Sequence, residues 1–242
     1  MRIARHSDPD RSLAWLGLLL HSTDSAYPIG GFAHSGGLEG LTGRGQVTTL
    51  EHLGEFLHHE IVDTLKFVEL PLLYQAWMAA TAEDEHSLVQ LDRLSEAVRF
   101  GAEPRLASRR LGIQRWSLFN KLHAASMEPP EFEWISALGV VLPHKHLCII
   151  AGIEAATMGV PAAAAMTALA HQTVMMVAQA ALKLVRVGQT GVQTLVAELA
   201  LRSPELVHQA MQLDLAEIGT CLPRYDIGTA WHETAHARMF LS

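Results

Sequence analysis

Apolar residues recur at helical spacing along most of this chain, and no stretch of useful length alternates between apolar and polar residues as a strand does. From position 50 onward an apolar residue returns every three or four positions. One helix face would then carry Leu53, Leu57, Ile61, Leu65 and Val68. Aromatic residues make up only 6% of the sequence, whereas Ala and Leu dominate, which favours helices over strands. The sequence therefore predicts an all-α fold.

Further helices are expected where similar stripes recur, over residues 88–98, 105–125, 144–158 and 161–187. The last of these is apolar almost all round, which is typical of a helix at the centre of a fold or in a subunit interface. Ser203 and Pro204 have the residue types of a helix cap and a first helical position, so another helix should start there. Residues 219–228 are expected to form a loop.

The length of 242 residues suits a single domain with a sizeable core. We therefore expect one helical bundle of about ten helices spanning residues 1–242. Its ends, residues 1–10 and 231–242, are expected to be flexible or docked on a partner. A mean hydropathy of +0.17 indicates a large core or apolar surface that a partner covers.

Charge and cysteine content exclude several classes of protein. The net charge of −7 argues against non-specific binding to nucleic acid. Two cysteines far apart in sequence exclude a disulfide scaffold and favour a reducing compartment, so we expect a cytoplasmic protein. The apolar run at 13–20 is short and follows Asp8 and Asp10, so we expect neither export nor a membrane span.

Residues 24–39 are too rich in glycine for a helix interior and too patterned for a linker. Pro28 fixes its own φ angle, and Gly30 and Gly31 after it permit positive φ or a close backbone approach. The segment is expected to form an ordered turn that carries function or locks a packing corner. It lacks the Gly-Lys-Ser/Thr ending of a phosphate-binding loop. His34 and Ser35 lie between glycine turns, where we expect their side chains to be presented to solvent.

The segment 232–236 is a literal H-E-x-x-H, which on a helix would place two imidazoles on one face with a glutamate as general base. One alternative interpretation is therefore a zinc-dependent hydrolase built on His232, Glu233 and His236. A catalytic zinc needs a third protein ligand, and the six residues after His236 include no good one. A second alternative is a helical binding module for some unrelated partner.

Residues 24–39 also resemble the N-terminal signature of the urease accessory protein UreF family. The same or a similar residue stands at Asp24, Pro28, Ile29, Gly30, Phe32, His34, Ser35, Gly37, Leu38 and Glu39. Residues 231–242 resemble the C-terminal signature, roughly His-Glu-x-x-Tyr-x-Arg-Leu-Phe-x-Ser, through His232, Glu233, Arg238, Phe240 and Ser242. His236 stands where the family usually has an aromatic residue, so a single substitution accounts for the H-E-x-x-H pattern.

A third resemblance lies at residues 185–193, where Gly188, Gln189 and Gln193 match the family. Arg186 replaces the family's proline and Val192 replaces its glycine, so the loop geometry at this point departs from the family pattern. The resemblance runs nearly end to end and is weakest between residues 64 and 142.

The resemblance implies an all-helical, dimeric cytoplasmic protein that is no enzyme. It implies binding to the accessory protein UreD/UreH and to the GTPase UreG, in a complex that delivers nickel to apo-urease. No tightly bound cofactor is expected. Transient nickel contacts are chemically reasonable, because Ni²⁺ accepts imidazole and carboxylate, and His52, His58, His59 and Glu60 or His144 and His146 are candidate surface groups.

Partner contacts are assigned on this basis to residues in the three segments that resemble the family. The residues are Tyr27, His34, Ser35, Glu39, Gln189, Trp231, His232, Glu233, Arg238 and Phe240. Self-association is expected through helix 161–187, whose many alanines would let two helices approach closely. Segment 231–242 holds aromatic residues beside an arginine, which are residue types enriched in interface hot spots.

Overall fold

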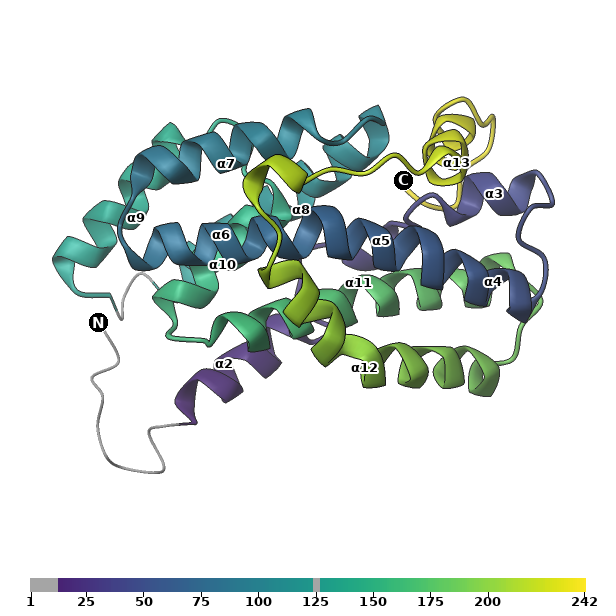
Figure 1. The fold of residues 1–242 in the computed structure, drawn as a ribbon, viewed down its shortest axis with the longest axis horizontal. Helices are drawn as coiled ribbons and strands as arrows, with labels where there is room; N and C mark the ends of the chain where they lie inside the picture. Colours follow the sequence, from purple (N-terminus) through teal and green to yellow (C-terminus); the bar gives the residue numbers. More distant parts are fainter. Residues whose placement is uncertain (1–12, 124–126) are drawn as a thin grey trace.

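The computed structural model describes residues 13–123 and 127–242, and in this part of the chain every regular element is helical (Figure 1). The predicted all-α class is therefore confirmed. The helices are α2 (Ala14–Thr23), α3 (Leu38–Gly43), α4 (Leu50–Phe56), α5 (Val62–Thr64), α6 (Leu70–Thr81), α7 (Glu85–Ala97), α8 (Ala102–His123), α9 (Pro129–Val141), α10 (Leu147–Thr157), α11 (Ala162–Leu184), α12 (Gln189–Met211) and α13 (Pro223–Glu233). They pack as a bundle whose described helices number ten when α4, α5 and α6 are counted as one.

Helices α4, α5 and α6 form one rod, because the π-helical turns Leu57–Ile61 and Leu65–Glu69 join them without a break. The predicted stripe is buried as expected, with Leu53, Leu57 and Leu65 fully shielded from solvent. A π-helical turn changes which backbone groups pair within a helix. The carbonyl of Phe67 in the second one accepts a hydrogen bond from the Gly219 N–H at 3.0 Å, which ties the loop after α12 to the rod.

The centre of the bundle is α10, an apolar helix that packs along α6. Gly152 makes this contact close, because a Cβ atom there would lie 2.6 Å from the carbonyl oxygen of Leu73. Helix α11 lies beside α10 and α12, and residues such as Ala165 and Ala178 are buried within the chain itself. Several small residues of α11 therefore serve internal packing, whereas Ala163 is exposed, and the expected self-association through this helix stays a prediction.

Two sequence predictions about helix boundaries were wrong. Helix α12 passes straight through Pro204. A proline cannot donate to the carbonyl four residues earlier, but the Ser203 hydroxyl donates to the Ala200 carbonyl oxygen at 2.8 Å and replaces the missing bond. The expected loop 219–228 is also only partly a loop, since α13 begins at Pro223, which occupies the first turn of the helix.

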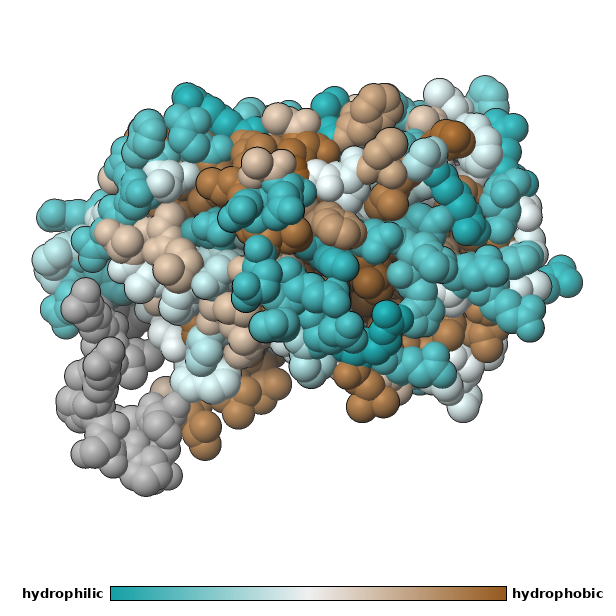
Figure 2. All heavy atoms as spheres, in the orientation of Figure 1, coloured by the Kyte–Doolittle hydropathy of each residue, from teal (hydrophilic) through white to brown (hydrophobic). Residues whose placement is uncertain are grey.

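The surface seen in Figure 2 is mostly polar, with apolar side chains gathered in its upper half and along its lower edge. None of the described helices is both long enough and apolar enough to cross a membrane. The expected end segment 1–10 lies outside the described residues, whereas residues 231–242 are ordered against the body of the protein.

Candidate functional site

The two terminal motifs meet in space. The last residues return to the loop before α3, and Figure 1 places the C-terminus beside α3 and α13. The Leu241 N–H donates to the Ala33 carbonyl oxygen at 2.7 Å, and the Ser35 N–H donates to the Ser242 carbonyl oxygen at 2.5 Å. The Ser35 hydroxyl donates to the same oxygen at 2.8 Å. We call this junction of residues 33–39 with 239–242 the tail clasp.

Glu39 fixes the tail through its carboxylate. Its Oε1 accepts from the Met239 N–H at 2.7 Å, and its Oε2 accepts from the Phe240 N–H at 2.9 Å. Hydrogen bonds to a charged acceptor are stronger than neutral ones. Phe240 is 5% exposed, so the tail is held by apolar burial as well as by polar contacts.

His232 of α13 joins this carboxylate to a second one. Its Nδ1 lies 2.7 Å from Glu103 Oε2 and its Nε2 lies 2.9 Å from Glu39 Oε2, and the ring is fully buried. Arg238 Nη1 donates to Glu103 Oε1 at 3.1 Å. Each ring nitrogen therefore faces a carboxylate oxygen, so the ring lies between the two carboxylates. We call Glu39, Glu103, His232 and Arg238 the charged cluster.

A pair of glycines allows α3 and α13 to come together. A Cβ atom on Gly40 would lie 1.9 Å from the carbonyl oxygen of Gly228, so the two helices touch backbone to backbone at this crossing. Glu39 immediately precedes Gly40 in α3, and His232 lies one turn after Gly228 in α13. The close approach therefore brings the carboxylate within hydrogen-bond reach of the imidazole.

The predicted turn is confirmed. Gly30, Gly36 and Gly37 have φ angles of 87°, 61° and 82°, a region that favours glycine. Gly31 is not among the positive-φ glycines. Gly37 then serves as the N-cap of α3 and sets the direction in which that helix begins.

The expectation that His34 and Ser35 are presented to solvent was wrong. His34 is 3% exposed and Ser35 is fully buried, because the tail covers the loop that carries them. His34 Nδ1 lies 2.6 Å from Ser242 Oγ. Burial, with the nearby Arg110 adding to it, lowers the pKa of His34. Both residues position the tail.

The other predicted site residues divide between core and surface. Tyr27 is buried, with its ring 5.3 Å from that of His21 in an edge-on contact. Trp231 is half-buried, and Arg44 Cζ lies 5.4 Å from its ring centroid. Glu233 and Arg238 are exposed, and so is Gln189, the first residue of α12.

The H-E-x-x-H segment does not have the geometry of a zinc site. Helix α13 ends at Glu233, so His236 does not stand one helical turn above His232. Both ring nitrogens of His232 already face carboxylates. Across residues 13–123 and 127–242, no group of three or more His, Cys, Asp or Glu side chains is placed to hold a metal ion. The zinc hydrolase interpretation has no support.

Two of the side chains on the long rod that were candidates for nickel contact are paired with arginines instead. Arg202 Nη1 lies 3.0 Å from His58 Nδ1, and burial together with Arg202 lowers the pKa of His58. Glu60 is buried and pairs with Arg224 at 3.3 Å. These side chains do not converge on one point.

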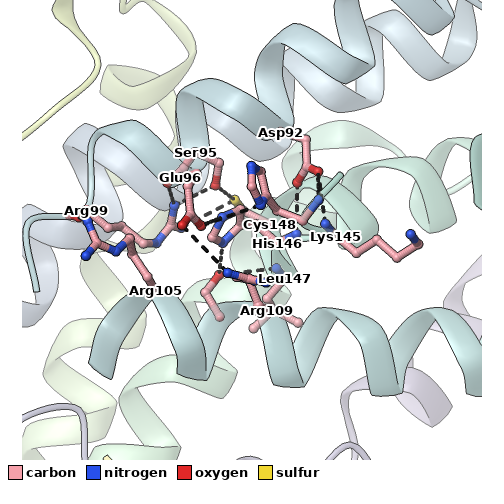
Figure 3. A network of polar contacts seen from close by, with 12 residues as sticks. Asp92, Ser95, Glu96, Arg99, Arg105, Arg109, Lys145, His146, Leu147 and Cys148 are labelled. Carbon is pink, nitrogen blue, oxygen red and sulfur yellow. Dashed lines mark hydrogen bonds and ion pairs between the residues drawn. The ribbon is translucent and has the colours of Figure 1, made fainter. Parts of the chain in front are cut away.

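Sequence reasoning did not identify a second polar network, which supports the start of α10 (Figure 3). The buried Asp92 carboxylate accepts the backbone N–H groups of residues 144, 145 and 146 at 2.7, 2.9 and 3.0 Å. Gly112 lies beneath this turn, since a Cβ atom there would be 1.9 Å from the Lys145 carbonyl oxygen. The carboxylate replaces the missing hydrogen-bond acceptors of the helix N-terminus.

This network contains a Ser–His–Glu chain. Ser108 Oγ lies 3.1 Å from His146 Nδ1, and Glu96 Oε2 lies 2.9 Å from His146 Nε2. Burial lowers the pKa of His146 to about 2, and the nearby Arg99 adds to the effect. A general base works best with a pKa near the working pH, so this imidazole is poorly suited to activate the serine. His146 is also fully buried, and its two contacts join the start of α10 to α7 and α8.

The same pKa shift predicts acid sensitivity. Above its ordinary pKa of 6.5 His146 is neutral in both states; as the pH falls below that value, only the unfolded chain takes up the proton. Stability should therefore fall between pH 7 and pH 5, by up to about 1.4 kcal/mol per pH unit from this residue. The slope of unfolding free energy against pH, measured by urea unfolding, should be shallower in His146→Gln. An equal slope in both proteins would contradict this origin.

A cavity of about 440 Å³ lies against the tail clasp. His34, Gly37 and Ser242 contribute to its wall, and most of its lining is apolar. Phe32 and Phe100 also line it and are 72% and 82% exposed. Exposed aromatic side chains beside a hollow are typical of a surface that binds a partner.

Comparison with known proteins gives one consistent family. The family model for UreF matches residues 47–200, more than half of the chain. The urease accessory protein UreF of Actinobacillus pleuropneumoniae serotype 5b is 28% identical over 229 residues, which are 94% of this chain and 99% of the relative. That of Bradyrhizobium diazoefficiens is 28% identical over 96% of this chain and 93% of the relative. The UreF protein of Pseudomonas putida is 28% identical over 93% of this chain and 96% of the relative.

Proposed function

The chain belongs to the UreF family of urease accessory proteins, and we propose that it acts as a non-catalytic adaptor in urease maturation. In this role it joins UreD/UreH and the GTPase UreG in the complex that delivers nickel to apo-urease. Nickel is the cargo of that complex, and any contact with this chain is transient. The observation that supports the proposal most is the tail clasp, which unites both terminal family signatures in one structure.

The predicted site residues at the tail clasp fall into two groups, one buried and one exposed. Tyr27, His34, Ser35, His232 and Phe240 are buried and hold the surface in shape. Trp231, Glu233 and Arg238 lie on its outer side, where a partner can reach them. We assign partner contact to these outer residues, with Gln189 as a separate contact at the start of α12 and Glu39 as the residue that positions the tail.

Two exposed apolar side chains extend this outer surface. Met239 is 62% exposed and Leu241 is 55% exposed, although their backbone N–H groups are bound to Glu39 and Ala33. A tail fixed by its backbone with apolar side chains turned outward suits a protein partner. The adaptor is further proposed to work in the cytoplasm and as a homodimer, as the family resemblance implies.

We expect Met239→Ser with Leu241→Ser to weaken binding to UreD/UreH by about tenfold or more, because burying a Leu or Met side chain contributes about 1.5–3 kcal/mol. Binding is measured by titration of the purified double variant, with thermal unfolding as the test of folding. The matched control is Val140→Ser with Leu201→Ser, two side chains 85% and 83% exposed on α9 and α12. Wild-type affinity in a stably folded tail variant would contradict the assignment.

A further inference from the structure

The outer side of the tail carries positive charge, although the chain as a whole is acidic. The net charge of the protein is −7, yet segment 234–242 contains one arginine and no aspartate or glutamate. That arginine is Arg238, whose side chain stays 39% exposed while it contacts the buried carboxylate of Glu103. The tail therefore departs in the sign of its charge from the average of the protein.

Two further cations lie against aromatic side chains of α13 and the tail. Lys183, near the end of α11, has its Nζ 5.5 Å from the ring centroid of Phe240. Arg44, at the C-terminal end of α3, has its Cζ 5.4 Å from the ring centroid of Trp231. Both basic residues are exposed, and the ion pairs within residues 13–123 and 127–242 include neither of them. The aromatic rings attract these cations and leave their charge open to solvent.

Few exposed carboxylates offset this charge. Among the acidic, lysine and arginine residues of α13 and the tail, the exposed ones are Glu233 and Arg238. Asp226, the other acidic residue of α13, is only partly exposed and lines the cavity beside the tail clasp. Since Arg44 and Lys183 add two positive charges, this side of the protein attracts anionic groups.

Exposed apolar side chains lie beside these cations. Met239 and Leu241 flank Phe240, over whose ring Lys183 lies, and Met239 directly follows Arg238 in the chain. We call Arg44, Lys183, Arg238, Met239 and Leu241 the tail surface. An apolar centre with polar and charged groups at its rim is the usual organisation of a protein–protein interface.

We propose that the tail surface binds an acidic segment of a partner protein, in which Asp or Glu side chains flank an apolar residue. Opposite charges across an interface fix its orientation and speed association. A nucleic acid would offer phosphates to the cations but no apolar side chain to cover Met239 and Leu241. The inference rests on the proposed function in taking the tail as a docking surface, and it adds the chemical character of what docks there.

Two model peptides test the chemistry of the tail surface without any accessory protein. The probe is the capped peptide Glu-Glu-Leu-Leu-Glu-Glu, and its control carries lysine in place of each glutamate. In NMR titrations of the full chain, the acidic peptide should shift the Met239 and Leu241 amide resonances at least about threefold more than the control does. Equal shifts from both peptides, or none from the acidic one, would overturn the proposal.

Binding to UreD/UreH provides the second measurement. Arg44→Gln with Lys183→Gln should weaken it about fivefold at low salt and by less at high salt, because salt screens exposed charges. The matched control is Arg93→Gln with Lys121→Gln, an exposed arginine and lysine on α7 and α8, which should bind as the wild type does. Thermal unfolding shows that both variants are folded.

The two measurements separate this inference from the proposed function. If the charge variant bound UreD/UreH like its control while Met239→Ser with Leu241→Ser bound weakly, the charge proposal alone would be overturned. If the wild-type protein bound no UreD/UreH but responded to the acidic peptide, the proposed function would be contradicted and the chemistry of the tail surface supported.

Discussion

Replacing His232 with leucine is expected to destabilise the protein by about 3–5 kcal/mol and to release the tail. The substitution removes the ring whose two nitrogens contact the buried carboxylates of Glu39 and Glu103. Arg238 still contacts Glu103, but Glu39 loses its side-chain partner in the charged cluster. The loss is measured by urea unfolding, and tail release by faster hydrogen exchange at the Met239 and Phe240 amides.

The chain offers a matched control four residues away. His236 is exposed, so His236→Leu should change stability by less than about 0.5 kcal/mol and leave exchange at the tail amides unchanged. If both histidine variants behaved alike, the charged cluster would not be the structure that holds the tail.

Replacing Gly40 with alanine is expected to cost at least about 3 kcal/mol, because the new methyl group would overlap the Gly228 carbonyl oxygen at 1.9 Å. Neither backbone can yield without separating α3 from α13. That separation would also move Glu39 away from His232, so tail exchange should accelerate with the loss of stability.

Gly43 is the control within the same helix. A Cβ atom there would meet nothing within 4 Å, so Gly43→Ala should be neutral or stabilising by up to about 1 kcal/mol. Thermal unfolding of both variants distinguishes a steric effect from a general intolerance of α3 to substitution. Similar melting temperatures for the two variants would show that the helix crossing is not as close as described.

Hydrophobic periodicity predicted the long rod and helices α7, α8, α10 and α11, because the spacing of apolar residues reflects the burial of one helix face, but it did not predict α9 or α13. It could not reveal the continuity of α12 through Pro204, which depends on the Ser203 hydroxyl replacing one backbone bond. Nor could it reveal the π-helical turns of the long rod, which leave the apolar stripe almost unchanged.

The candidate site was predictable in its parts but not in its assembly. Both terminal signatures were identifiable, yet nothing in their spacing indicates that Ser35 and Ser242 touch. The glycines predicted a turn correctly, but backbone freedom says nothing about what covers that turn, so the burial of His34 was missed. Glu103 lies in a region of weak resemblance, and only the fold brings its carboxylate to His232.

We propose above that this chain is the adaptor through which the other accessory proteins mature urease. The most direct measurement is urease activity after apo-urease is incubated with nickel, GTP, UreD/UreH and UreG, with and without this protein. We predict that activity depends on the protein and is strongly reduced by the folded double variant Met239→Ser with Leu241→Ser. Equal activation in the absence of the protein would contradict the claim.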